Sequence, residues 1–192
     1  MKQNRSNILV FGLLIIVCAL YRVWDARPMG FAPQIAMALF AGSVIRDKRI
    51  SFLFPILSML VSDAFYQLLY AQGLTSIKGF YSGQWENYLL IASITVIGFF
   101  IKKNNIKHII LGSLTGAIFY FLISNFLVWI GGGLDINNQP YARTWNGLAS
   151  CYTQAIPFFK WSVFATFIFN TIFFGGYYLV NRYVWSIKKQ LS

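Results

Sequence analysis

The stretch "GFAPQIAMALFAGSVIRDKR", residues 30–49, is apolar enough for a membrane helix but too short for an ordinary span. Pro33 has no N–H to donate and suits the first turn of a helix. A helix from Gln34 to Ile45 would be only about 18 Å long, against about 30 Å of bilayer hydrocarbon. Because lipid cannot satisfy backbone groups, we expect protein or a wet cavity to cover the end that falls short of the membrane surface.

The composition of the chain is that of an integral membrane protein. Of its 192 residues, 57% are hydrophobic and 11% are charged, and the mean hydropathy is +0.59. Soluble domains carry about 25% charged residues. The first apolar run, residues 8–21, follows Lys2 and Arg5 as in a signal peptide, but no small-residue cleavage site follows it. We therefore expect a retained first helix.

The apolar runs predict a single all-α domain, residues 1–192, with six transmembrane helices of which the second is short. Each full span needs about 20 residues. We place the spans at about 7–24, 33–46, 50–71, 86–101, 109–131 and 160–182. The polar-aromatic stretch before the last span also predicts a separate short helix, from Asn146 to Ile156, that ends at Pro157. We expect this helix to lie at the outer interface or to dip back into the bundle.

The distribution of charge predicts the orientation. The formal net charge is +11, and most of the 16 lysines and arginines lie at the two termini and in residues 46–49 and 102–107. Cytoplasmic loops of membrane proteins carry this excess. We expect both termini to be cytoplasmic, in a bacterial inner membrane, with the loops near 25–32, 72–85 and 132–159 outside. In this interpretation the basic residues mark the cytoplasmic side and contact the lipid bilayer. We expect no nucleic-acid partner.

Three polar residues within the spans form the main candidate site. Asp63, Asn125 and Asn170 are on three different helices and are predicted to lie at about the same depth on the outer side. Ionisable residues inside spans usually face a bundle interior or a wet cavity. We expect the three to line a cavity that is open to the outside. The alternative is that they only hold helices together, with Asp63 paired to Arg22 or Arg27.

The long outer loops supply candidates for the mouth of that cavity. Trp85 and Glu86 lie at the start of the fourth span, and Arg143 and Trp145 lie in the loop before the last. Aromatic rings offer flat contact surface and a few polar groups fix the orientation of a ligand. Each of these residues, taken singly, is also typical of an interface anchor.

The quoted stretch carries a ridge of small residues. Ala38, Ala41 and Gly42 lie at helical spacing i, i+3 and i+4, with Gln34 one turn above. Small residues at this spacing allow helices to approach closely. The ridge predicts either packing within the chain or a docking face for a partner helix.

Enzymatic and metal chemistry have little support in the sequence. The chain contains no Gly-Xaa-Ser-Xaa-Gly, HExxH or Walker motif. Cys18 and Cys151 form no CxxC pair, and the single histidine, His108, is placed at the opposite, cytoplasmic end from Cys151. We expect no catalytic activity, no cofactor and no metal. Uphill transport of a solute would need another protein or a gradient.

The order "FAPQIAMALFAGSVI", "FPILSMLVSDAF", "LISNFLVW" and "CYTQAIPFFK" resembles a family of small uncharacterised bacterial membrane proteins. That family is similar to the S components, the substrate-capture subunits of energy-coupling-factor vitamin transporters. The resemblance covers residues 28–178. It implies a six-helix bundle that binds a vitamin or precursor at a site open to the outside, and it adds Trp129 and Tyr152 to the candidate ligand-binding residues.

The resemblance also implies a partner. S components dock a transmembrane coupling subunit, which works with ATPases, through small residues commonly spaced Ala-Xaa-Xaa-Xaa-Ala on the first helix. Ala32 and Ala36 have this spacing here, but they fall at the second span. The competing hypothesis is a structural or accessory subunit of a larger membrane complex, with the small-residue ridge as its interface and no ligand.

Overall fold

The computed structural model describes the backbone of residues 2–190 and the side chains of residues 11–182. The chain forms six helices in the part that the structure describes, which confirms the all-α prediction. Their bounds are α1 Lys2–Val23, α2 Gln34–Val44, α3 Lys48–Ala71, α4 Gln84–Gly98, α5 Ile106–Ile130 and α6 Trp145–Gln190.

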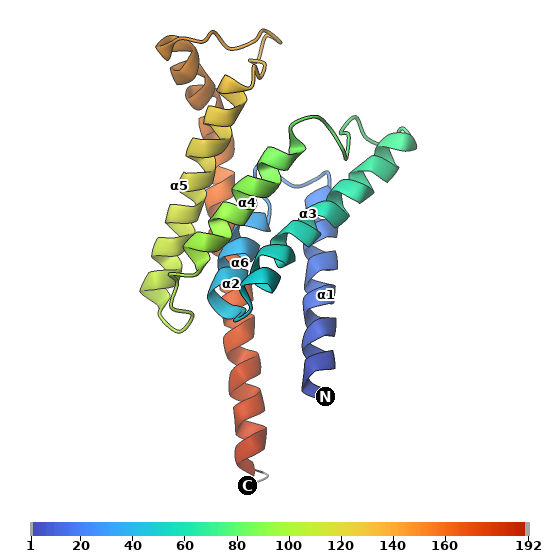
Figure 1. Cartoon of the computed structure of the whole chain (residues 1–192), viewed down its shortest axis with the longest axis vertical. Helices are drawn as coiled ribbons and strands as arrows, with labels where there is room; N and C mark the ends of the chain where they lie inside the picture. The colour runs from blue at the N-terminus through green and yellow to red at the C-terminus, as the bar shows by residue number, and fades with distance from the viewer. Residues whose placement is uncertain (1, 191–192) are drawn as a thin grey trace.

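Consecutive helices alternate in direction, so the connections sort into two kinds at two ends (Figure 1). Residues 24–33, 72–83 and 131–144 connect helices toward one end, called here the long-loop end. Residues 45–47 and 99–105 connect them at the opposite end, called here the short-turn end. Helices α3 and α5 and residues 145–182 of α6 are long and apolar enough to cross a membrane. Six spans, and the side of the membrane that each end faces, stay predictions.

Two of the helices at the short-turn end begin with capping side chains. The carboxylate of Asp47 accepts hydrogen bonds from the backbone N–H groups of Arg49 and Ile50 at the start of α3. Asn105 accepts from the N–H groups of Lys107 and His108 at the start of α5. Such caps satisfy N–H groups that have no partner within the helix. The polar residues in these short turns therefore fix where the two helices begin.

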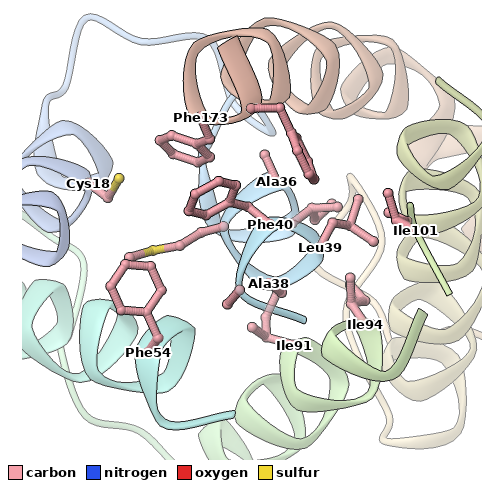
Figure 2. Close-up of a cluster of buried hydrophobic side chains, with 14 of the residues drawn as sticks. Cys18, Ala36, Ala38, Leu39, Phe40, Phe54, Ile91, Ile94, Ile101 and Phe173 are labelled. Atoms are coloured by element: carbon pink, nitrogen blue, oxygen red, sulfur yellow. The ribbon is translucent and has the colours of Figure 1, made fainter. Parts of the chain in front are cut away.

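Helix α2 lies at the centre of the bundle, with α3, α4, α5 and α6 packed around it (Figure 2). Nine of its 11 residues are buried. Leu39 and Phe40 project into a cluster that includes Phe54 of α3, Ile94 of α4 and Phe173 of α6. A helix with so few polar residues has no face for water, so the other helices enclose it. Protein thus covers the short helix, as its length predicts.

The small-residue ridge packs within the chain. Ala38 and Ala41 are fully buried, and a Cβ added to Gly42 would collide with the backbone of Thr95 and Gly98 on α4. The absence of side chains is what lets the two helix backbones approach this closely. The prediction of a docking face at Ala38, Ala41 and Gly42 is therefore wrong for this structure, because α4 already occupies it.

The last helix corrects a second prediction. Residues 145–190 form one helix of 46 residues, with Pro157 inside it, rather than a short helix that ends at Pro157 and a separate span. A proline removes one backbone hydrogen bond. The rings of Tyr152 and Phe159, on either side of Pro157, both pack on Phe121 of α5, with centroids 5.6 and 4.5 Å away. Contact with the same neighbouring helix before and after the proline keeps the helix continuous.

Candidate functional site

The three polar residues of the predicted layer do not lie at one depth. The side-chain amide of Asn170 on α6 donates to the hydroxyl of Ser113 on α5, at 2.7 Å. Ser113 precedes Asn125 on the same helix by twelve residues, or about 18 Å. The same-depth prediction is wrong for Asn170, because α6 begins at Trp145 and extends further toward the long-loop end than the expected span near 160.

Asn170 faces a groove between α5 and α6 instead. The groove has a volume of about 280 Å³, and Lys103, Ser113 and Tyr178 also line it. The Ser113 hydroxyl donates to the carbonyl of Ile109, so it accepts from Asn170, and the Oδ1 of Asn170 has no partner among the described residues. Because Lys103 belongs to the short-turn end, this groove is remote from the long loops.

Asn125, Trp129 and Tyr152 hold backbone near the long-loop end of α5. The amide of Asn125 donates to a carbonyl of its own helix, that of Phe121, at 2.7 Å. The indole N–H of Trp129 donates to the carbonyl of Ala142 at 2.9 Å, and the hydroxyl of Tyr152 donates to a carbonyl of α5 at 2.7 Å. Every one of these bonds ends on a backbone carbonyl, so the three side chains act locally as supports for helix and loop.

The four residues predicted for a cavity mouth are divided between two places. Trp85 and Glu86 line a shallow groove of about 280 Å³ between α4 and α5. The Trp85 side chain is 62% exposed. Arg143 and Trp145 are exposed near the start of α6, where Trp145 is 86% exposed. The groove beside Trp85 is lined by α4 and α5 residues and does not include these two.

Asp63 is the centre of a buried polar cluster at the long-loop end. Its carboxylate forms a salt bridge with Arg22 of α1, which also donates to the hydroxyl of Ser62. The other carboxylate oxygen accepts from the side-chain amide of Gln84 and, at 2.6 Å, from the hydroxyl of Tyr88, both on α4. Asp63 is only 2% exposed. The alternative that pairs Asp63 with Arg22 is confirmed. Because Asp63 also accepts from Gln84 and Tyr88, its carboxylate links α1, α3 and α4.

A second arginine adds positive charge to the cluster. Arg27, in the loop before α2, donates to the carbonyl of Arg22 at 2.7 Å, to the hydroxyl of Tyr66 at 3.3 Å and to the carbonyl of Phe31 at 3.4 Å. Within residues 11–182, Arg22–Asp63 is the one salt bridge, so Arg27 has no carboxylate partner there. Two guanidinium groups and one carboxylate leave the cluster with a net positive charge.

The start of α2 is buried and its polar groups are unpaired. Gln34 is 5% exposed, and neither its amide nitrogen nor its amide oxygen has a partner among the described residues. The helix begins after Pro33 with no side-chain cap, and its first backbone bond runs from the N–H of Met37 to Pro33. The N–H groups of Gln34, Ile35 and Ala36 form no hydrogen bond within the described chain. Such buried donors usually pair with protein, water or a ligand.

The loop before α2 joins this unpaired helix start to the Asp63 cluster through Arg27. Both α2 and α4 run from the long-loop end, and Gly42 packs on the turn of Gly98. Arg27 donates to the carbonyl of Arg22, the residue whose side chain pairs with Asp63. Arg27 also binds the carbonyl of Phe31, shortly before the helix begins. We call Arg22, Arg27, Gln34, Asp63 and Tyr88 together the α2-start site.

Sequence reasoning found only part of this site. It singled out Asp63, considered Arg22 and Arg27 only as its partners, and treated Gln34 only as the top of the small-residue ridge. One signal was present, since Gln34 and Ser43 are the two polar side chains of residues 34–44. In the described residues, no three or more His, Cys, Asp or Glu side chains group in a way that could hold a metal ion.

The architecture is that of an all-helical bundle in which three helices are long and apolar enough to cross a membrane, with a polar cluster buried at one end. The chain belongs to a family of unknown function, DUF6580, whose family model matches residues 2–189. Comparison with curated proteins and comparison with solved structures both give no match.

Proposed function

We propose that the chain is a substrate-binding membrane subunit, without enzymatic activity, that captures a small molecule at the outer face for import. The observation that carries the proposal is the buried, unpaired amide of Gln34 at the start of a half-length helix. Leaving a buried donor or acceptor unpaired costs about 1–3 kcal/mol. A solute that pairs with these groups would recover that free energy on binding, which is what a capture site needs.

The length of α2 supports this reading. Its 11 residues span about 16 Å, roughly half the hydrocarbon thickness. Transport proteins often bind solutes where such half-length helices end inside the bundle. In our proposal all six helices cross or enter a bacterial inner membrane, both termini are cytoplasmic, and the long-loop end is outside. The concentration of lysine and arginine at the termini and short turns supports that orientation.

The loop of residues 24–33 would form the roof of the site. Gly30 has φ +85°, and a Cβ added there would lie 2.6 Å from the carbonyl of Phe158 on α6. The hydroxyl of Ser162, also on α6, donates to the carbonyl of Gly30 at 3.1 Å. The loop is therefore seated closely on α6 while Gln34 is buried. Entry of a solute requires this contact to open.

Import against a gradient would need a partner, because this sequence contains no nucleotide-binding motif. In the proposed assembly a membrane coupling subunit with its ATPases supplies the energy, as the resemblance to S components implies. Since α4 covers the ridge of Ala38, Ala41 and Gly42, that subunit would dock on a different surface.

A ligand screen tests the proposal. Purified protein, freed of bound solutes, is heated in detergent with vitamins, haem precursors and nucleobases, and thermal stabilisation is measured. We expect at least one solute to stabilise the wild type and the Gln72→Leu control, which changes an exposed glutamine, but not the Gln34→Leu variant. Stabilisation that survives Gln34→Leu would remove this site from the proposal. If no solute stabilises the protein, the structural-subunit hypothesis is the better one.

A further inference from the structure

We infer that the α2-start site takes a small monocarboxylate, whose carboxylate group binds at the first turn of α2. The inference rests on the proposed capture function and adds the chemical class of the solute. It is carried by three features of the described residues: an excess of unpaired donors, an excess of positive charge, and one unpaired acceptor beside them.

The unpaired groups are mostly donors. The backbone N–H groups of Gln34, Ile35 and Ala36 and the side-chain N–H₂ of Gln34 have no acceptor within the described chain. A carboxylate has two oxygens, with about four acceptor positions, and no donor. It can therefore pair with several of these groups at once, whereas an alcohol or an amine would leave most of them unpaired.

The charges near the site favour an anion. The start of a helix carries the equivalent of about +0.5 charge. Arg22 is balanced by Asp63, but Arg27 has no carboxylate partner in residues 11–182. Asp25, the other acidic residue nearby in sequence, is exposed. A cation would meet two guanidinium groups and the positive end of α2, and its binding would be opposed by all three.

The same features narrow the anion further. The cluster has a net charge of one positive unit, which comes from Arg27. This net charge matches a monoanion better than a phosphate dianion. The side-chain oxygen of Gln34 is also unpaired and accepts only from a donor. A solute with a hydroxyl or N–H group a few ångströms from its carboxylate would satisfy both requirements. We therefore expect hydroxy or amido monocarboxylates.

The test compares solutes that differ in charge and little else. Two pairs, lactate with lactamide and pantothenate with panthenol, are titrated against the full chain in detergent, by thermal shift and calorimetry. We expect the acid of at least one pair to bind about tenfold or more tightly than its neutral partner. If a neutral member binds and its acid does not, the carboxylate inference is wrong and the capture function stands. If nothing in this set or in the wider screen binds, both are wrong.

Variants of Arg27 distinguish binding at this site from a general effect of positive charge on the protein. We expect Arg27→Gln to reduce the ratio of acid to neutral affinity about tenfold, while Arg27→Lys keeps most of it. Lys78→Gln, which removes an exposed charge from another loop at the same end, should leave the ratio unchanged. The ratio is measured within each variant, so a change in stability does not affect it. An equal loss in Arg27→Gln and Lys78→Gln would overturn the inference.

Discussion

Replacement of Asp63 by asparagine should destabilise the bundle through charge rather than through size. The asparagine side chain has the same shape, but it leaves Arg22 without its counter-charge. It also replaces one carboxylate oxygen by an N–H₂ group. In one orientation the N–H₂ group takes the place of the oxygen that accepts from Gln84 and Tyr88, so it faces the groups that donated to that oxygen. In the other orientation it faces the guanidinium group of Arg22.

The size of the effect follows from the burial of the pair. Breaking a fully buried ion pair costs about 3–5 kcal/mol. Asp63 is almost fully buried, but the Arg22 side chain is 22% exposed, so water can solvate part of the unpaired guanidinium. We therefore expect a loss of about 2–3 kcal/mol in the free energy of unfolding. At about 2–4 °C per kcal/mol for a chain of this size, the melting temperature should fall by about 4–12 °C.

Unfolding by SDS in mixed detergent micelles, followed by tryptophan fluorescence, measures this free energy. Asp25→Asn is the matched control, because Asp25 is exposed in the neighbouring loop, and it should change stability by less than about 0.5 kcal/mol. The double variant with Arg22→Gln should lose less stability than the sum of the two single variants, by at least about 1 kcal/mol. Strictly additive losses, or an Asp63→Asn variant as stable as the control, would refute the reasoning.

Three further predictions concern other parts of the chain. Gly42→Leu should prevent α2 from reaching α4 and lower stability by about 1–3 kcal/mol, measured by the same unfolding assay. Backbone hydrogen bonds from Gln139 and Asn137 lower the pKa of Asp135 below 3.8, so the loop should keep these bonds above that pH and lose them as the pH falls through the lowered pKa. The loss is measured as weaker protection of the two amides from exchange, relative to the intrinsic exchange rate at each pH. Reporter fusions after Lys103 should read cytoplasmic, and fusions near Asn138 should read outside.

Sequence reasoning predicted seven helices, six spans and a separate short helix at residues 146–156, whereas the described residues form six. Apolar runs are separated by charge or by polar-aromatic loops, so five helices were placed correctly from composition alone. It failed at Pro157, where a local breaker signal was outweighed by packing of Tyr152 and Phe159 on α5. A proline's cost is local and visible in the sequence, but the contacts that offset it come from another helix and are not.

The site was less predictable for a related reason. The depth of Asn170 was wrong because the last helix begins at Trp145 and not near residue 160. Sequence position also gives neither the rotation of a helix nor its neighbours, so Asn170 could not be assigned to the groove beside Lys103. Asp63 stood out because a carboxylate in a span is costly wherever it points. Gln34 was overlooked because a neutral polar residue at a helix start is common, and only burial without a partner makes it unusual.

The start of α2 differs from the starts of α3 and α5 in a way that bears on function. Those two helices begin with Asp47 and Asn105, whose side chains accept the free N–H groups. Position 33 is a proline, which offers no such acceptor, although a capping residue there would contribute about 1 kcal/mol. It would also fill, from within the chain, the acceptor position that a carboxylate would take. The satisfied Arg22–Asp63 pair fixes the surrounding helices, and the uncapped start of α2 leaves donors free to bind a solute.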